Sequence, residues 1–266
     1  MVWSSRIRAA FVVGGVLASA MLAGARACEA QEIVAQPHAS DPALAAAAAG
    51  DYLPNTLTAK VGATRIFAFG SGGYDSARRG PLIDSAVEAW IWGPFSLRAQ
   101  SAYSNDTARM RPSVGGRAQL LRQEAQGVDG ALTVFFKTEG FTESEGEIET
   151  FVSLGRRFEQ LAVLGNAVYG QDPEGNERDG ELRLAAYHQS GKLLVGVDSR
   201  VRFAIGTQHG HAAVTEPRLD FMAGAVATYA TGPLALFAEA GPNAFQLSGA
   251  DLRAGVSALA GLGAAF

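Results

Sequence analysis

Apolar and polar residues alternate along most of this chain from Thr56 onward. Between positions 192 and 205 the apolar side chains recur with a period of two, as Leu193, Val195, Val197, Val201, Phe203 and Ile205. The positions between them carry polar or small residues, among them Lys192, Gly196, Asp198, Arg200 and Arg202. Because alternate side chains of a strand point to opposite faces, the pattern predicts strands with one apolar and one polar face.

The alternation predicts about twelve strands, separated by segments rich in turn-forming residues. Their expected bounds are 56–70, 81–93, 95–105, 112–124, 127–139, 146–158, 161–171, 180–190, 192–205, 217–230, 233–243 and 251–266. Strict alternation over about ten residues is typical of membrane-barrel strands, and single-chain bacterial barrels have an even number of them. We therefore expect an all-β chain that forms one closed antiparallel transmembrane β-barrel over residues 56–266.

The connections between these strands are expected to alternate in length. The short ones are Gly93-Pro94, Gln126-Gly127, Glu159-Gln160, Ser190-Gly191 and Gly232-Pro233. The long ones are Ser71 to Gly80, Asp106 to Arg111, Gly140 to Glu145, Asp172 to Asp179, Thr207 to Glu216 and Asn243 to Ala250. Barrels of this kind have short periplasmic turns and longer external loops, so the alternation places the N-terminus on the periplasmic side.

Aromatic residues fall near both ends of the predicted strands, as the aromatic girdles of a membrane barrel do. Near the short turns they are Phe95, Phe158, Tyr229 and Phe266, and near the long loops Phe69, Tyr103, Phe136, Tyr169, Phe203 and Phe221. By parity Trp90 and Trp92 both point into the barrel, where the pattern gives no reason for two indoles.

The last predicted strand carries an additional signal. Its alternate residues are Leu252, Ala254, Val256, Ala258, Ala260, Leu262, Ala264 and Phe266. Alternate apolar residues that end in a terminal phenylalanine resemble the assembly signal of bacterial outer-membrane β-barrel proteins of the porin-like class. The resemblance implies a location in the outer membrane, contact with its lipid and lipopolysaccharide, and recognition of the strand that ends at Phe266 by the barrel assembly machinery.

Residues 1–30 are predicted to be a cleaved signal peptide, because Arg6 and Arg8 precede an apolar stretch rich in small residues. Cleavage is expected after Ala30, with Ala27 as the alternative. A retained membrane anchor, or a lipid attached to Cys28, are the other interpretations. After this segment no run approaches the roughly 18 consecutive apolar residues of a membrane helix, and only helices and closed barrels satisfy the backbone in lipid.

Residues 31–55 are expected to form a flexible periplasmic linker. The segment contains Pro37, Pro42 and Pro54, and Gly50 follows a short alanine run. These residues end a helix quickly. A short helix that plugs the barrel is the alternative.

Charged residues fall at the inward positions of the predicted strands. They cannot face lipid, where Arg or Lys at mid-depth costs roughly 2–4 kcal/mol. These predicted lumen charges are Lys60, Asp84, Glu88, Arg98, Arg117, Lys137, Glu147, Glu149, Arg157, Glu181, Arg183, Asp198, Arg200, Arg202, Asp220, Glu239, Asp251 and Arg253. The two signs balance, whereas a pore selective for one charge is expected to carry a ring of one sign.

The strand number also bears on function. About eight strands leave only packed side chains inside a barrel and about sixteen leave an aqueous channel, so about twelve lie between these cases. We therefore expect a non-enzymatic barrel that is structural or a narrow porin-like channel for small solutes. An adhesive or receptor barrel is a third interpretation, although such barrels usually have longer loops. The net charge of −4 gives no sign of a nucleic-acid partner, and nothing indicates the oligomeric state.

An enzymatic alternative rests on the sequence Tyr187-His188-Gln189-Ser190-Gly191. His188 and Ser190 share one face of a strand, which by parity is the lipid side. The pair resembles the His-x-Ser-Asn-Gly motif of outer-membrane phospholipase A and of the lipid A deacylase barrels, although the asparagine after the serine is missing here. The resemblance implies ester hydrolysis with Ser190 as nucleophile and His188 as base.

Three further groups of residues bear on metal binding. The acidic stretch 172–181 is expected to be a solvated loop, because its spacing fits no standard calcium loop. His209 and His211 lack the third ligand that a transition-metal site needs. Glu143, Glu145, Glu147 and Glu149 are expected to form a charged rim and wall of the lumen. We expect no metal and no other cofactor.

Overall fold

A computed structural model describes residues 53–62, 64–105, 108–141, 146–173, 177–207, 217–247 and 249–266. The predicted signal peptide and nearly all of the predicted linker lie outside these residues. The strands are β1 (Ile66–Asp75), β2 (Gly80–Trp92), β3 (Phe95–Ser104), β4 (Arg109–Leu121), β5 (Asp129–Thr138), β6 (Gly146–Phe158), β7 (Leu161–Gln171), β8 (Glu177–Ser190), β9 (Leu193–Thr207), β10 (Pro217–Thr231), β11 (Leu234–Leu247) and β12 (Arg253–Ala265). One short helix, α3 (Gln123–Gln126), lies between β4 and β5. Within the described ranges, no helix has the length and apolar character needed to cross a membrane.

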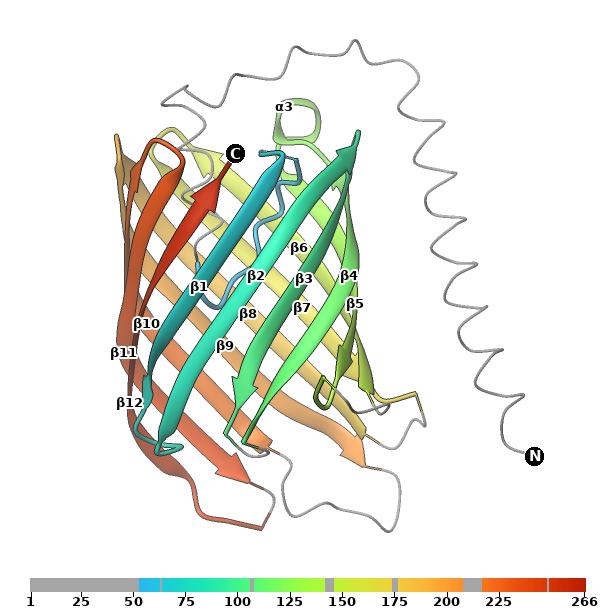
Figure 1. The fold of residues 1–266 in the computed structure, drawn as a ribbon, viewed down its shortest axis with the longest axis vertical. Helices are drawn as coiled ribbons and strands as arrows, with labels where there is room; N and C mark the ends of the chain where they lie inside the picture. The colour runs from blue at the N-terminus through green and yellow to red at the C-terminus, as the bar shows by residue number, and fades with distance from the viewer. Residues whose placement is uncertain are drawn as a thin grey trace, which may run out of the picture. The chain divides into compact units, whose positions relative to one another are not determined.

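The twelve strands form one closed antiparallel barrel, in which each strand pairs with its neighbours in the chain and β1 pairs with β12 (Figure 1). The closing pair runs from Phe67 opposite Ala265 to Asp75 opposite Ser257. Closure pairs the backbone groups that the edges of an open sheet would expose, and this pairing is what allows a sheet to stand in lipid. The expected closed antiparallel barrel of twelve strands is therefore confirmed.

The expected long connections are shorter in the structure, because β1 continues to Asp75 and β11 to Leu247. The short connections follow the expected order, with one exception. Turns of two residues join β2 to β3, β6 to β7, β8 to β9 and β10 to β11. The remaining connection on that side was expected at Gln126-Gly127, but it spans residues 122–128 and includes α3. Gly127 ends α3 in the left-handed region, with φ of 79°, a conformation that glycine adopts without steric cost.

The first strand begins at Ile66 rather than at Thr56. Residues 53–62, which we call the lumen segment, precede it, and their apolar side chains Leu53, Leu57, Ala59 and Val61 are buried. These alternating apolar side chains therefore pack against the inner surface of the barrel wall and do not face lipid. Gly62, with φ of 76°, turns the chain out of the extended conformation before β1 starts.

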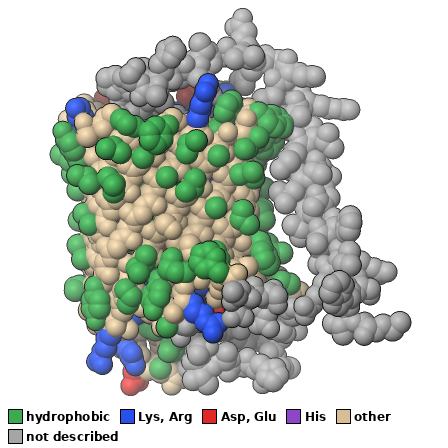
Figure 2. Space-filling view, in the orientation of Figure 1, with side chains coloured by type: hydrophobic (Ala, Val, Ile, Leu, Met, Phe, Trp, Pro, Cys, Tyr) green, Lys and Arg blue, Asp and Glu red, His purple; other side chains and the backbone are tan. Residues whose placement is uncertain are grey.

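The outer face of the barrel is apolar. Leu182, Leu193, Val195, Val197 and Leu262 have exposed fractions of 50, 45, 43, 58 and 53%. Their predicted outward orientation is therefore confirmed. On the face drawn in Figure 2, hydrophobic side chains gather in two bands, and Lys and Arg lie at the ends. A closed barrel with an apolar exterior is the form in which strands cross a membrane.

Two tryptophans that parity placed inside the barrel lie on opposite sides of its wall. The pairing of β2 with β3 shifts register between Trp90 and Trp92, and such a β-bulge reverses the alternation. Trp92 is 46% exposed, so its predicted inward orientation is wrong. Trp90 points inward beside Gly62, at which a Cβ would lie 2.6 Å from the indole Cδ1, and its Nε1 donates to the carbonyl of Gly93 at 3.0 Å.

Two aromatic residues expected in the girdles are withdrawn from the outer surface, Phe69 partly buried and Phe95 buried. Phe69 lies inside the barrel, where its ring meets Phe237 edge to face at 5.9 Å between centroids. Phe95 is 9% exposed and packs against Trp92 at 4.7 Å. Phe158, Tyr229 and Phe266 are exposed on the outer surface, as expected.

Candidate functional site: the barrel lumen

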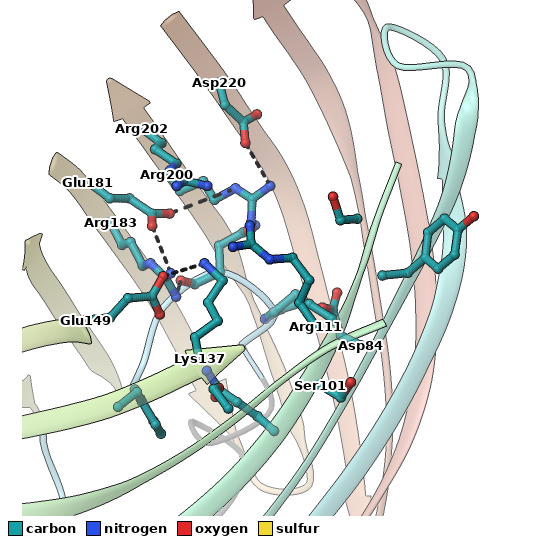
Figure 3. Close-up of a pocket in the computed structure, with 18 of the residues that line it drawn as sticks. Asp84, Ser101, Arg111, Lys137, Glu149, Glu181, Arg183, Arg200, Arg202 and Asp220 are labelled. Atoms are coloured by element: carbon teal, nitrogen blue, oxygen red, sulfur yellow. Dashed lines mark hydrogen bonds and ion pairs between the residues drawn. The ribbon is translucent and has the colours of Figure 1, made fainter. Parts of the chain in front are cut away.

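A cavity of about 530 Å³ lies between the lumen segment and the long loops (Figure 3). Its floor is Leu53 to Leu57 of the lumen segment. Its walls combine charged side chains with the aromatic rings of Phe69, Phe135 and Phe151. Because Phe135 and Phe151 are each only 1% exposed, the cavity offers a polar solute mainly charged groups.

One wall of the cavity is built on β8, β9 and β10 by alternating charges. Arg183 and Arg200 stand directly opposite each other in the pairing of β8 with β9, an arrangement that is destabilising for like charges. Glu181 offsets it, because its two carboxylate oxygens lie 3.0 Å from Arg183 Nη2 and 4.0 Å from Arg200 Nε. Asp220 completes this wall, with Oδ2 at 3.2 Å from Arg200 Nη2.

The same chain of ion pairs continues along both directions of the wall. On one side Arg202 pairs with Asp179 and lies 4.0 Å from Glu147. Lys137 then bridges Glu147 and Glu149, at 3.3 and 2.6 Å from its Nζ. Figure 3 shows Lys137 and the arginines of β8 and β9 projecting into the cavity.

On the other side Arg78, from the loop between β1 and β2, reaches Asp220 at 2.6 Å. The loop is shaped by Asp75, whose Oδ1 accepts the Arg78 N–H at 2.8 Å. The guanidinium also lies 4.5 Å from the centroid of Phe245. Arg78 and Asp75 were not among the predicted lumen charges, because residues 71–80 were expected to form a surface loop, and a loop residue has no strand parity.

Below the lumen segment, toward the short turns, a second charged cluster is built around Glu88. Its carboxylate lies 3.2 Å from Arg98 Nη1 and 2.5 Å from Arg117 Nη1, and accepts the hydroxyl of Ser96 at 2.6 Å. All four side chains are buried. Arg117 also donates to the carbonyl of Thr58 in the lumen segment.

The lumen segment is held by polar side chains of the barrel wall. Asp198, with an exposed fraction of 0%, accepts the Asn55 N–H at 2.7 Å and the Thr56 hydroxyl at 2.5 Å. Asn55 Nδ2 donates to Glu239 Oε1 at 2.8 Å. Arg183 Nη1 donates to the Asn55 carbonyl at 2.9 Å, which joins the lumen segment to the charged wall above it.

Asn166 on β7 binds the backbone of the lumen segment as a neighbouring strand would. Its Oδ1 accepts the Leu57 N–H and its Nδ2 donates to the Leu57 carbonyl, both at 2.8 Å. The same Nδ2 lies 2.9 Å from Ser153 Oγ, which fixes the amide orientation. Asn166 was not among the predicted site residues, because a neutral amide at an inward position looks like any other polar lumen residue in the sequence.

Two apolar contacts complete the seat of the lumen segment. Leu53 packs into a cluster of Ala162, Leu164, Ala185, Tyr187, Leu194 and Val226. Leu57 packs with Phe135, Phe151 and Val168. Through these two leucines the lumen segment buries apolar surface of the inner barrel wall.

The predicted lumen charges fall into three groups in the structure. The charged residues from Asp84 to Glu239 lie at inward positions of the strands. Most of them line the cavity or belong to the cluster around Glu88. The exceptions are Arg157 and the two buried acids that hold the lumen segment, Asp198 and Glu239. Arg157 lies on the short-turn side, and its guanidinium binds Gln189 and Tyr187. Lys60, Asp251 and Arg253 are exposed.

His188 and Ser190 lie on the outer face of β8, beside the short turn to β9, and both are exposed. Within the described residues, no hydrogen bond joins the two side chains and no acid pairs with His188. Asp198, the nearest acid in sequence, faces the lumen and binds Asn55 and Thr56.

The described residues form no second site that could bind a metal ion. The described residues contain no group of three or more His, Cys, Asp or Glu side chains arranged to hold a metal ion. His209 and His211, Glu143 and Glu145, and the centre of the acidic loop at 174–176 lie outside the described residues.

Comparisons with known proteins identify the fold. No family model matches the chain, and no curated protein sequence matches it. Among solved structures, the NanC porin matches with a TM-score of 0.54 and 12% identity, over 75% of this chain and 100% of that one. The KdgM porin matches with a TM-score of 0.49 and 10% identity, over 76% of this chain and 98% of that one. LpxR from Salmonella typhimurium matches with a TM-score of 0.45 and 10% identity, over 76% of this chain and 100% of that one. Likeness at this identity shows a shared fold and nothing of substrate, and the chain therefore has the closed antiparallel β-barrel fold that the NanC porin also has.

Proposed function

We propose that this barrel is a narrow, non-enzymatic channel for small polar solutes, with a lumen whose charges balance. The observation that carries the proposal is the composition of the cavity lining. Its basic residues are Arg78, Arg98, Arg111, Lys137, Arg178, Arg183, Arg200 and Arg202, and its acidic residues are Asp84, Glu139, Glu147, Glu149, Asp172, Asp179, Glu181 and Asp220. Equal numbers of the two signs favour passage of neutral or weakly charged solutes over selection of one ion.

Conductance of the purified protein in planar bilayers tests this proposal. We expect discrete conductance steps and, in a salt gradient, a reversal potential near zero. Asp220→Asn and Arg200→Gln form a matched pair, because each removes one charge from the same ion pair. The first is expected to shift selectivity toward anions and the second toward cations. The absence of steps from every variant would contradict the channel, and shifts in the same direction would contradict a balanced lumen.

The placement of His188 and Ser190 supports a barrel without hydrolytic activity. A lipid hydrolase needs the nucleophile and base in hydrogen-bond contact, with a group that orients the imidazole. The exposed pair on β8 lacks these contacts. We keep ester hydrolysis as the alternative, to be tested with purified protein on phospholipid and lipid A.

The ends of the chain carry two related proposals. We propose that residues 1–30 are removed on export, which N-terminal sequencing of the protein from outer membranes tests. We propose also that the barrel assembly machinery recognises β12 and Phe266, whose N–H donates to the Ile66 carbonyl at 2.8 Å. Deletion of Phe266 should then lower the amount of folded protein in the outer membrane without lowering export.

A further inference from the structure

We infer that the lumen segment, residues 53–62, is a displaceable gate, and that solutes cross the barrel only when it leaves its seat on Asn166, Asp198 and Glu239. The inference rests on the proposed channel function. It adds that the pore has a closed state built from the protein's own chain.

The seated segment closes the half of the lumen that faces the short turns. On the far side of the segment, Lys60, Gly62, Glu88, Trp90 and Arg117 border a pocket of only about 10 Å³. That is room for about one water molecule. The cavity on the long-loop side measures about 530 Å³. A solute that enters from the loops therefore meets the lumen segment as the floor of the cavity.

The segment reaches the wall around much of the barrel circumference. Its backbone and side chains bind Arg117 and Gln119 on β4, Asn166 on β7, Arg183 on β8, Asp198 on β9 and Glu239 on β11. β7, β8 and β9 are neighbours in the sheet, whereas β4 and β11 are separated from them and from each other by other strands. The segment thus spans the lumen rather than lying along one side of it.

The barrel does not need the segment for its own closure. β1 pairs with both β2 and β12 from Ile66 and Phe67 onward, so every strand already has two neighbours without residues 53–62. The bonds that hold the segment involve side chains of the wall and no strand pairing. Its departure therefore breaks side-chain hydrogen bonds and two leucine contacts, and leaves the backbone ladder intact.

The seat is also incompletely satisfied while it is occupied. Glu239 is 2% exposed, and its Oε2 is buried with no hydrogen-bond partner. Asp198 is fully buried, and the segment donates two hydrogen bonds to its carboxylate. Buried carboxylates are costly to keep from water, so hydration of both groups in the open lumen offsets part of what the segment contributes when seated.

A disulfide can hold the segment in its seat. A Cβ built on Gly155 of β6 lies 3.5 Å from the Cβ of Ala59, within the range that a disulfide requires. The same Cβ comes within 2.6 Å of Leu164 Cδ2, the flexible end of a side chain that must turn aside. We therefore choose Ala59→Cys with Gly155→Cys in full-length protein that also carries Cys28→Ser. The matched control is Ala59→Ser with Gly155→Ser, which has similar size and cannot cross-link.

The conductance of both double variants is measured in planar bilayers before and after addition of a reductant. We expect oxidised cysteine protein to conduct about tenfold less than the same protein after reduction, because a space for one water passes no hydrated ion. The serine control is expected not to respond. A third chain, in which residues 53–61 are replaced by alternating Gly and Ser, loses the seat contacts and is expected to conduct more than the unaltered protein.

The outcomes separate the gate from the channel. If the unaltered protein conducts and the oxidised disulfide leaves its conductance unchanged, the gate is wrong and the channel stands. If the Gly/Ser chain folds, as judged by heat-dependent mobility in gels, and neither it nor the reduced cysteine protein conducts, the channel fails and the gate with it. Loss of conductance on oxidation and its return on reduction establish the gate even where the Gly/Ser chain does not fold.

Discussion

Asn166 offers the sharpest measure of how firmly the lumen segment is seated. The side chain is 4% exposed and makes two hydrogen bonds of 2.8 Å to the backbone of Leu57, which is itself 8% exposed. Asn166→Ala removes both bonds and leaves the Leu57 N–H and carbonyl without partners. The substitution touches no strand pairing, because the backbone of residue 166 keeps its place in β7.

The expected size of the effect follows from these two groups. A buried polar group left without a partner costs about 1–3 kcal/mol, so two groups cost about 2–6 kcal/mol. Water that enters the space of the lost amide offsets part of this cost, and we expect the lower part of the range, about 2–3 kcal/mol. At 1.4 kcal/mol for each factor of ten, the population of the displaced segment should rise roughly 30- to 140-fold.

Hydrogen–deuterium exchange of the folded protein in detergent measures this rise. The Leu57 amide should lose protection by the same factor in Asn166→Ala, while the amides of β7 and β8 keep theirs. The matched control is Asn243→Ala, because Asn243 is 5% exposed and inward-facing like Asn166 but has no hydrogen-bond partner for either amide atom. Unchanged protection of Leu57 in the Asn166 variant, or an equal loss in the control, would refute the assignment of the seat.

Three further predictions concern the wall and its outer face. Leu182→Arg, in the middle of β8 and 50% exposed to lipid, is expected to lower the free energy of unfolding by roughly 2–4 kcal/mol, measured by urea denaturation in detergent; no loss would contradict a lipid-facing position. Gly73→Ala should weaken the β1–β12 seam, because its Cβ would lie 2.1 Å from the Ala258 carbonyl oxygen, and a lower melting temperature checks this. Ser190→Ala and His188→Ala should leave phospholipid turnover at the background of the unaltered protein, whereas hydrolysis that is abolished by Ser190→Ala would make the barrel an enzyme.

The architecture of the barrel could be predicted from local pattern. Alternation with a period of two specifies strands and their two faces, and the sequence of short and long connections specifies how antiparallel strands follow one another. Leu182 and Val197 face outward for this reason alone, since charges such as Glu181 and Asp198 on the neighbouring positions cannot face lipid. Closure then follows, because an open sheet edge cannot stand in a membrane.

The register between strands could not be predicted from the alternation of apolar and polar residues. Alternation places Arg200, Glu181 and Asp220 inside the barrel, but it does not show that Arg200 lies closer to Asp220, at 3.2 Å, than to Glu181, at 4.0 Å. Which of the two acids lies closer to Arg200 depends on hairpin register and on side-chain length. The alternation within a single strand contains no information on register. The bulge that turns Trp92 outward is a similar case. One extra residue reverses the alternation of faces, and the composition of the strand does not reveal it.

The sequence by itself thus determined that the chain forms a β-barrel, which positions face lipid, and that the interior is charged with both signs. Only the tertiary structure decided the use of residues 53–62. Leu57, Ala59 and Val61 alternate with polar residues, as they would in a lipid-facing strand or in a segment that packs against an apolar patch of the lumen. Alternation shows that one side of the segment is apolar, but it does not show what covers that side. The choice was made by Asn166, Asp198 and Glu239, side chains more than a hundred residues away whose hydrogen bonds hold the segment inside the barrel.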